Sequence, residues 1–281
     1  MVGRLIFVFA VSMAVTTSAY ALPNNDDHAY TLNAGTWQTG IWDVRYGATD
    51  NLELSNVWPV MLLRVPNIAV KWRFYDGDMF SAAVGTGVFH YDLSYHRQDA
   101  APFTSTLVPT SLTGSWDLNP FFLSASLIST QTVTSGSFED TSAGETTDFD
   151  QDSLTSALNL ETTIFRPTLY WDRGDGFAWL FDVTLSLDQR IGAQADTVFA
   201  VENGDRVSGR GVLQGSGEVD LSARKARNFS VSALWYWSSF HLKVGLSMGH
   251  VLLPYLNIFP VNQNNQPTKA SIPRFDMYWR F

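Results

Sequence analysis

The last eleven residues of the chain, Ser-Ile-Pro-Arg-Phe-Asp-Met-Tyr-Trp-Arg-Phe at positions 271–281, decide the fold class. Apolar side chains occupy every second position from residue 275 to residue 281, and polar or amphipathic side chains fill the positions between them. Successive side chains of a β-strand point to opposite faces of the sheet. The segment therefore predicts a strand with one apolar face and one polar face.

The same two-residue alternation recurs upstream, most clearly in residues 68–74, 177–187, 229–237 and 240–248. Turn-forming groups such as Asp-Gly-Asp at 76–78 and Glu-Asn-Gly-Asp at 202–205 separate the runs. Fourteen candidate strands result, near residues 29–37, 40–47, 52–63, 67–75, 79–91, 104–116, 119–132, 157–171, 177–190, 193–202, 206–221, 228–237, 240–252 and 269–281. Twelve remain if the first two, which are short, are not full strands.

The composition excludes several classes of protein. The 281 residues contain no cysteine, so disulfide scaffolds and thiolate chemistry are ruled out. A net charge of -9 argues against a nucleic-acid partner, which requires a basic surface. Charged residues make up 16% of the chain and aromatic residues 14%, whereas a soluble domain carries about 25% charged residues. The chain thus has fewer charged side chains for a water-exposed surface, and more aromatic side chains, than a typical soluble domain.

The N-terminal segment resembles a targeting sequence rather than part of the folded domain. Arg4 precedes an apolar run from Leu5 to Val15, and small residues Ala19 and Ala21 stand where a signal peptidase would cut. We expect residues 1–21 to be a cleaved signal peptide and residues 22–281 to form one domain. The alternative, a retained membrane anchor, would need about 20 apolar residues.

Two architectures accommodate many alternating strands, a soluble sandwich and a membrane β-barrel. Three further features favour the barrel. Short turns alternate with long polar loops, and the polar faces are rich in Ser, Thr and Gly. Tryptophans also lie near strand ends, where the edge of a bilayer holds amphipathic rings. The residues that we expect at the membrane interface are Trp72, Trp179, Trp235, Trp237 and Trp279.

With a signal peptide in front and an amphipathic last strand ending on Phe281, the chain resembles Gram-negative outer-membrane β-barrel proteins. The resemblance implies an all-β, closed antiparallel transmembrane barrel, for which we expect 12–14 strands, and a bacterial outer-membrane location reached through the periplasm. It also implies that Phe281 belongs to a sorting signal read by the barrel-assembly machinery, and that outer-membrane lipid and lipopolysaccharide are partners. Pro273 departs from the pattern, because proline cannot donate to a strand ladder.

The polar faces carry charges of both signs that a barrel would enclose. One interpretation is a narrow, porin-like pore whose opposed charges select small solutes. The other is an interior filled by ion pairs and water, in a non-conducting structural or surface-interaction barrel that acts through its outer loops. The candidate constriction residues are Lys71, Arg73, Asp182, Lys243 and Asp276.

A lipid-modifying hydrolase is a third reading, based on His241, Ser247 and His250. His241 and Ser247 are separated by roughly 20 Å along a strand, so we assign no catalytic residues. The acidic segment 137–152 lacks the glycine and terminal glutamate of a calcium loop, and we predict no metal or cofactor. Arg224, Lys225 and Arg227 form a basic cluster that could contact lipopolysaccharide phosphates.

Overall fold

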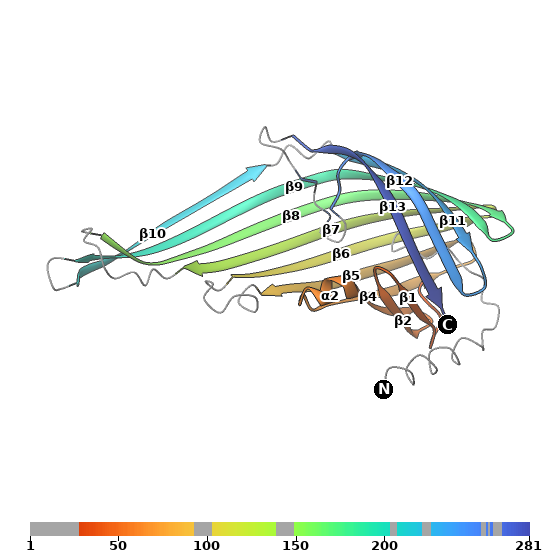
Figure 1. Cartoon of the computed structure of the whole chain (residues 1–281), viewed down its shortest axis with the longest axis horizontal. Coiled ribbons are helices and arrows are strands. Elements are labelled where there is room, and N and C mark those ends of the chain that lie inside the picture. Colours follow the sequence, from red (N-terminus) through yellow and green to blue (C-terminus); the bar gives the residue numbers. More distant parts are fainter. Residues whose placement is uncertain are drawn as a thin grey trace.

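The computed structural model is almost entirely β-structure (Figure 1). It describes residues 28–92, 103–138, 149–202, 207–220, 226–253, 257, 259–260 and 266–281. The predicted signal peptide, residues 1–21, lies outside this range. The elements are β1 (Trp37–Gly40), β2 (Val44–Thr49), β3 (Leu52–Asn56), α2 (Trp58–Leu62), β4 (Asn67–Asp76), β5 (Phe80–Asp92), β6 (Phe103–Leu118), β7 (Phe121–Phe138), β8 (Phe149–Gly174), β9 (Phe177–Glu202), β10 (Val207–Asp220), β11 (Arg227–Tyr236), β12 (Phe240–His250) and β13 (Lys269–Arg280).

Antiparallel pairing joins thirteen strands in one sheet, and twelve of them close into a barrel. The chain closes the ring by pairing β13 with β1, where Trp37 and Phe281 exchange two backbone hydrogen bonds of 2.8 and 3.0 Å. β10 is the extra strand. It pairs with the outer half of β9, beyond the part of β9 that pairs with β11. At this seam, the pairing of β1 with residues 278–280 of β13 satisfies backbone groups that an open sheet edge would leave exposed to lipid.

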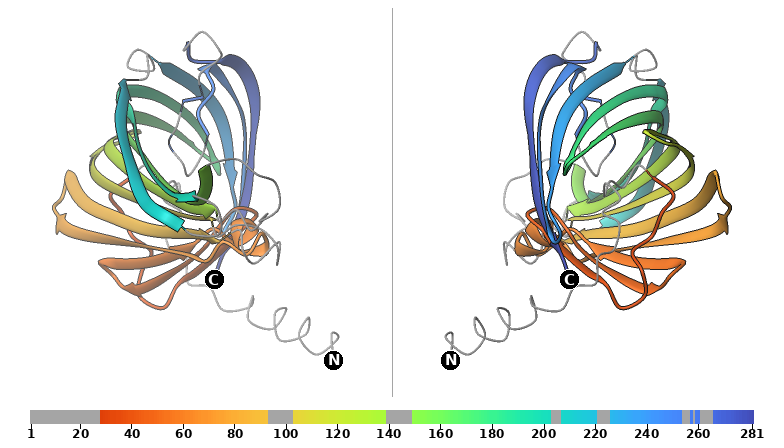
Figure 2. Two further views of the ribbon diagram at one scale, coloured as in Figure 1. Left: turned by 90° about the vertical axis from the view of Figure 1, so that its left-hand side faces the viewer. Right: turned by 90° about the vertical axis from the view of Figure 1, so that its right-hand side faces the viewer.

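The distribution of side chains is the inverse of a soluble core. Outward-facing apolar side chains are exposed, among them Leu112 at 53% and Leu246 at 41%. Inward-facing hydroxyls such as Ser115 and Ser230 are fully buried. A sandwich would bury the apolar faces between two sheets, so this arrangement excludes it. The views along the barrel show the strands arranged in a ring (Figure 2).

The connections differ at the two ends of the barrel. Turns of two or three residues join the strands at the end that holds the C-terminus, for example Asp175 and Gly176 between β8 and β9. The connections at the opposite end are generally longer, such as the one spanning residues 251–268 between β12 and β13. This is the alternation of short turns and long loops that the sequence predicted.

The wall is uneven in height. β8 and β9 have 26 residues each, and β6 and β7 have 16 and 18. We call these four strands the tall wall. β1, β2 and β3 have only 4, 6 and 5 residues, and we call them the low wall. A membrane-crossing strand needs about 9–11 residues, so the low wall is too short to cross a bilayer.

Several predicted boundaries were wrong. The expected strand 40–47 begins only at Val44, and the expected strand 157–171 is part of the longer β8. The expected strand 29–37 is not a strand before Trp37, and its first residues lie within the barrel. The expected strand 52–63 ends at Asn56 and gives way to α2, which begins with Pro59 in its first turn, a position that proline favours. The expected strands 177–190 and 193–202 form the single strand β9. No helix in the described residues is long and apolar enough to cross a membrane.

Candidate functional site

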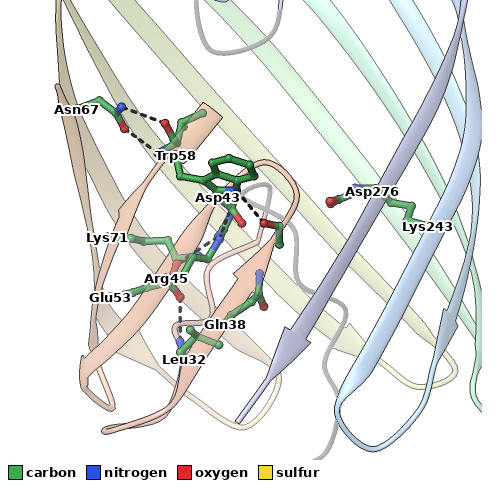
Figure 3. A network of polar contacts seen from close by, with 12 residues as sticks. Leu32, Gln38, Asp43, Arg45, Glu53, Trp58, Asn67, Lys71, Lys243 and Asp276 are labelled. Carbon is green, nitrogen blue, oxygen red and sulfur yellow. Dashed lines mark hydrogen bonds and ion pairs between the residues drawn. The ribbon is translucent and has the colours of Figure 1, made fainter. Parts of the chain in front are cut away.

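The lumen of the barrel holds two clusters of charged side chains, and the first lies inside the low wall (Figure 3). Arg45 from β2 forms ion pairs with Asp43 and, at 3.2 Å, with Glu53 from β3. Lys71 from β4 approaches the same Glu53 carboxylate at 3.7 Å. Arg45 and Glu53 are 4% and 2% exposed, so each buried charge depends on the other for its compensation.

A second cluster lies on β9, β11, β12 and β13. Arg274 Nη1 is 2.6 Å from Asp182 Oδ2, and Ser230 makes hydrogen bonds to both of these side chains. Lys243 faces Asp276 at 3.7 Å on the neighbouring strand pair. Opposite charges on adjacent strands thus line one side of the interior. This arrangement places fixed charges of both signs along the interior.

The predicted constriction residues fall into separate groups. Lys71 belongs to the cluster of the low wall, and Asp182, Lys243 and Asp276 belong to the second cluster. Arg73 lies elsewhere, at the short-turn end, where its guanidinium donates to the Asp50 backbone carbonyl at 2.9 Å. The geometry therefore shows two charge clusters and a rim arginine, and their assignment as a constriction remains a prediction.

The N-terminal part of the described chain enters the lumen, which the sequence did not predict. The Ala29 N–H donates to the inward-facing Ser115 hydroxyl at 2.8 Å, and the Leu32 N–H donates to Glu53 at 2.9 Å. Ala29 is fully buried. We call residues 28–34 the luminal segment. The sequence predicted a strand here because Tyr30, Leu32 and Ala34 alternate as they would in a strand.

Aromatic contacts hold the luminal segment at the short-turn end. The ring of Tyr30 lies 5.5 Å from that of Phe122, and the ring of His28 meets Phe122 edge-on. The Arg73 guanidinium also lies over the Tyr30 ring, 5.8 Å from its centre. Gly47 lets the segment pass, because a Cβ atom there would lie 2.1 Å from the Asn33 carbonyl oxygen.

A second inward segment occupies the opposite end of the lumen. Phe259, in the connection between β12 and β13, is fully buried, and its backbone exchanges two 3.1 Å hydrogen bonds with the Gln189 side chain. Asn257 donates to the inward-facing Thr130 hydroxyl at 3.0 Å. Segments from two distant parts of the chain therefore approach the lumen from its two ends.

The structure does not assemble the histidines and serine considered for a hydrolase. His241 is fully buried, and its ring stacks 4.5 Å from that of Tyr278. Ser247 donates to Asn228, and His250 accepts from the Arg227 backbone N–H at the far end of β12. The three residues thus have separate environments, and Ser247 does not adjoin either histidine as a nucleophile would adjoin its base.

Four of the tryptophans expected at a membrane interface lie towards the short-turn ends of their strands, and Trp237 lies in the turn between β11 and β12. Aromatic contacts link several of them: Phe177 contacts both Trp179 and Trp235, and Phe240 contacts both Trp237 and Trp279. Trp72 is 53% exposed, and its ring contacts Phe74. These contacts give the outer face a belt of aromatic side chains, as an interface of membrane and water favours.

Some predicted residues lie outside the described part of the chain. Arg224 and Lys225 of the basic cluster are among them, and Arg227 is the first residue of β11, with an exposed side chain. The central part of the acidic segment 137–152, from residue 139 to residue 148, is also outside it. At the C-terminus, Phe281 completes the pairing with β1, and its role in sorting remains a prediction.

The closed antiparallel wall, the exposed apolar exterior and the polar interior together decide the class. The chain is a β-barrel of the outer-membrane type. No protein-family model and no curated protein matches its sequence.

Among solved structures, the barrel is similar to the CymD monoaromatic hydrocarbon channel, with 11% identity, a TM-score of 0.41, and coverage of 78% of this chain and 60% of the channel. It is similar to the outer-membrane protease OmpT from Escherichia coli, with 10% identity, a TM-score of 0.35, and coverage of 88% and 91%. A Pseudomonas aeruginosa FadL homologue gives 9% identity, a TM-score of 0.30, and coverage of 77% and 78%. The strand pairing described above, rather than these scores, carries the assignment of the barrel.

Proposed function

We propose that the protein is a bacterial outer-membrane channel for the passive passage of small solutes, closed at rest by the luminal segment. The observation that carries this proposal is the combination of a charge-lined interior with a chain segment that enters it. Hydrogen bonds from the Ala29 and Leu32 N–H groups tie the segment to the wall, and Thr31 and Ala34 donate to Asp50 in the turn between β2 and β3. At about 1 kcal/mol each, these four bonds and the aromatic contacts together set the cost of displacing the segment.

The clusters described above would give the open lumen its selectivity. Glu53 presents charge from the low wall and Lys71 from the neighbouring β4, while Arg274, Lys243 and their acidic partners present charge from the other side. Because both signs are fixed on opposing strands, small polar solutes would be oriented as they pass. Lys71, Asp182, Lys243 and Asp276 are therefore the residues that we propose to line the pore, with Arg73 at its rim.

A planar-bilayer recording tests the proposal. The mature chain, from residue 22, is compared with a variant that lacks residues 22–34 and with a matched variant that lacks residues 139–148 in a predicted outer loop. We expect the first deletion to raise the frequency or size of unitary currents and the second to leave them unchanged. Folded protein that gives no unitary current in any of the three forms would refute a channel.

A non-conducting barrel is the second candidate, and the position of Phe259 favours it. This side chain is fully buried at the end opposite the luminal segment, so the lumen is occupied from both ends. In that case the outer loops would carry the function. The same recording separates the candidates, because a non-conducting barrel stays silent after the N-terminal deletion.

The membrane assignment brings further proposed partners. The exposed apolar face would contact outer-membrane lipid, and Arg227, together with Arg224 and Lys225, would contact the phosphates of lipopolysaccharide. The barrel-assembly machinery would read the last strand through Phe281. Removal of Phe281 should lower the amount of folded barrel in outer-membrane fractions, and an unchanged amount would oppose this role.

A further inference from the structure

The part of β13 that lies away from the C-terminus, from Lys269 to Met277, lacks a strand partner on one side. β12 pairs with β13 over its whole length, from Lys269 to Trp279. On the other side, β1 pairs only with residues 278–280, since β1 ends at Gly40. Within the described residues, no strand pairs with this edge between Lys269 and Met277. These nine residues match the length that crosses the hydrocarbon layer, about 9–11 residues.

One backbone N–H and one indole N–H partly replace the missing strand ladder of β13. The Ile41 N–H donates to the Met277 carbonyl at 3.1 Å, and Trp42 Nε1–H donates to the Phe275 carbonyl at 3.0 Å. Trp58 Nε1–H caps the end of β1 by donating to the Gly40 carbonyl at 2.9 Å, as Figure 3 shows beside the low wall. Side chains thus satisfy carbonyl groups that lipid would leave unpaired.

Pro273 fits this open edge. Hydrogen-bonding groups of a strand alternate between its two sides. The carbonyls of Met277 and Phe275 point to the side of β1, so residue 273 presents its backbone groups to the same side. Proline has no N–H to leave unsatisfied there. The residue that departed from the sequence pattern therefore lies where the ladder is missing.

Both faces of this stretch of β13 are exposed. Residues 269–273 are all exposed, including the inward-facing Ile272 at 40%. The inward-facing residues of β11 contrast with it, since Ser230 is 0% and Ser232 is 3% exposed. α2 begins beside the end of β1, where Trp58 reaches the Gly40 carbonyl, and α2 and the residue after it present Leu62 at 72% and Leu63 at 66% exposure. Apolar side chains therefore border an accessible stretch of the wall.

We propose that the wall between the upper edge of β13 and α2 is a lateral portal between the lumen and the hydrocarbon layer. Its ligands are small amphipathic molecules with an apolar body and one polar group. The apolar body would pass Ile272 and α2, and the polar group would meet Arg274, which lies two residues along the same inward face and keeps 33% of its side chain exposed. The proposal rests on the proposed function and names the class of solute.

Single-cysteine labelling tests the portal, because the chain has no cysteine of its own. A bimane fluorophore is attached to Ile272→Cys in vesicles of brominated phosphatidylcholine, whose acyl chains quench it on contact. The inward-facing control is Ser111→Cys on β6, which pairs with both neighbours there. The outward-facing controls are Leu246→Cys, beside Pro273, and Leu112→Cys on β6.

We expect the two outward labels and Ile272→Cys to lose most of their emission, and Ser111→Cys to keep it. Protection of Ile272→Cys equal to that of Ser111→Cys would overturn the portal while leaving the channel intact, since the bilayer recording measures conduction independently. Quenching of Ile272→Cys should also fall when 12-carbon alkyl maltoside is added as a competing amphiphile. Unchanged quenching under that competition would overturn the assigned ligand class.

Discussion

The tall wall and the low wall of this barrel are held together by different interactions. Strands β6 to β9 are held by long, continuous ladders, with up to 26 residues in a strand. Strands β1 to β3 have 4 to 6 residues and depend on side chains: the Arg45–Glu53–Lys71 cluster inside and the indoles of Trp42 and Trp58 at the edge. The comparison teaches that charge and indole hydrogen bonds can replace backbone pairing where a barrel wall is cut short.

The largest difference between the walls should follow from removing a buried carboxylate. Glu53→Ala leaves Arg45 buried without one of its partners and removes the acceptor of the Leu32 N–H. We expect a loss of about 3–5 kcal/mol in the free energy of unfolding. Asp188→Ala on the tall wall breaks an exposed pair with Arg190 and should cost less than about 1 kcal/mol.

Equilibrium unfolding by urea in lipid vesicles measures both variants. Equal losses for the two substitutions would contradict the distinction between a wall held by buried charge and a wall held by strand pairing.

A lysine introduced on the outer face should destabilise the tall wall more than the region of α2, the reverse of the order expected for the carboxylate substitutions. Leu127→Lys places a charge on the exposed apolar face of β7, where lipid would surround it. We expect a loss of about 2–4 kcal/mol, as for a cation near the middle of a bilayer. Leu62→Lys, on the exposed α2 beyond the end of the short strand β3, should cost no more than about 1 kcal/mol, as for a cation near the headgroup layer. A larger loss of unfolding free energy for Leu62→Lys than for Leu127→Lys would contradict the assignment of the outer face of β7 to the hydrocarbon layer.

The smallest effect concerns one hydrogen bond. Trp58→Phe keeps an aromatic ring but removes the donor to the Gly40 carbonyl, which should cost about 1–2 kcal/mol. Trp116→Phe is the matched change on the tall wall, where the indole N–H has no partner among the described residues, and it should be nearly neutral. Melting of the folded barrel, followed by its mobility in unheated gels, ranks the two variants. Identical melting temperatures would mean that the indole does not seal the low wall.

The sequence predicts the strands of the barrel best where one face meets lipid. The expected strands 228–237, 240–252 and 269–281 correspond closely to β11, β12 and β13. Lipid requires apolar side chains at every second position, so the alternation is strong and its period is two. The polar face was also predicted correctly for Asp182 and Lys243, which are buried inside the barrel.

The luminal contents could not be predicted from alternation. Residues 29–37 alternate as a strand would, yet Ala29 and Leu32 bond to the interior of the barrel. The face of a charged residue is set by its parity, but its depth depends on the register of neighbouring strands, which is why Arg73 lies at the rim. The short run Trp-Pro-Val-Met-Leu at 58–62 is continuously apolar, a pattern compatible with either a buried strand or a helix. Only the structure shows that it forms the helix α2.

The most direct test of the account is a spin-label scan along β12, from Phe240 to His250, in lipid vesicles. Each single-cysteine label is challenged with oxygen, which concentrates in hydrocarbon, and with a water-soluble nickel chelate. The account predicts that oxygen collisions peak at Leu242, Val244, Leu246 and Met248, with minima at the positions between them. Oxygen accessibility without a two-residue period, or with its maxima at His241, Lys243 and Ser247, would contradict a barrel whose apolar face meets lipid.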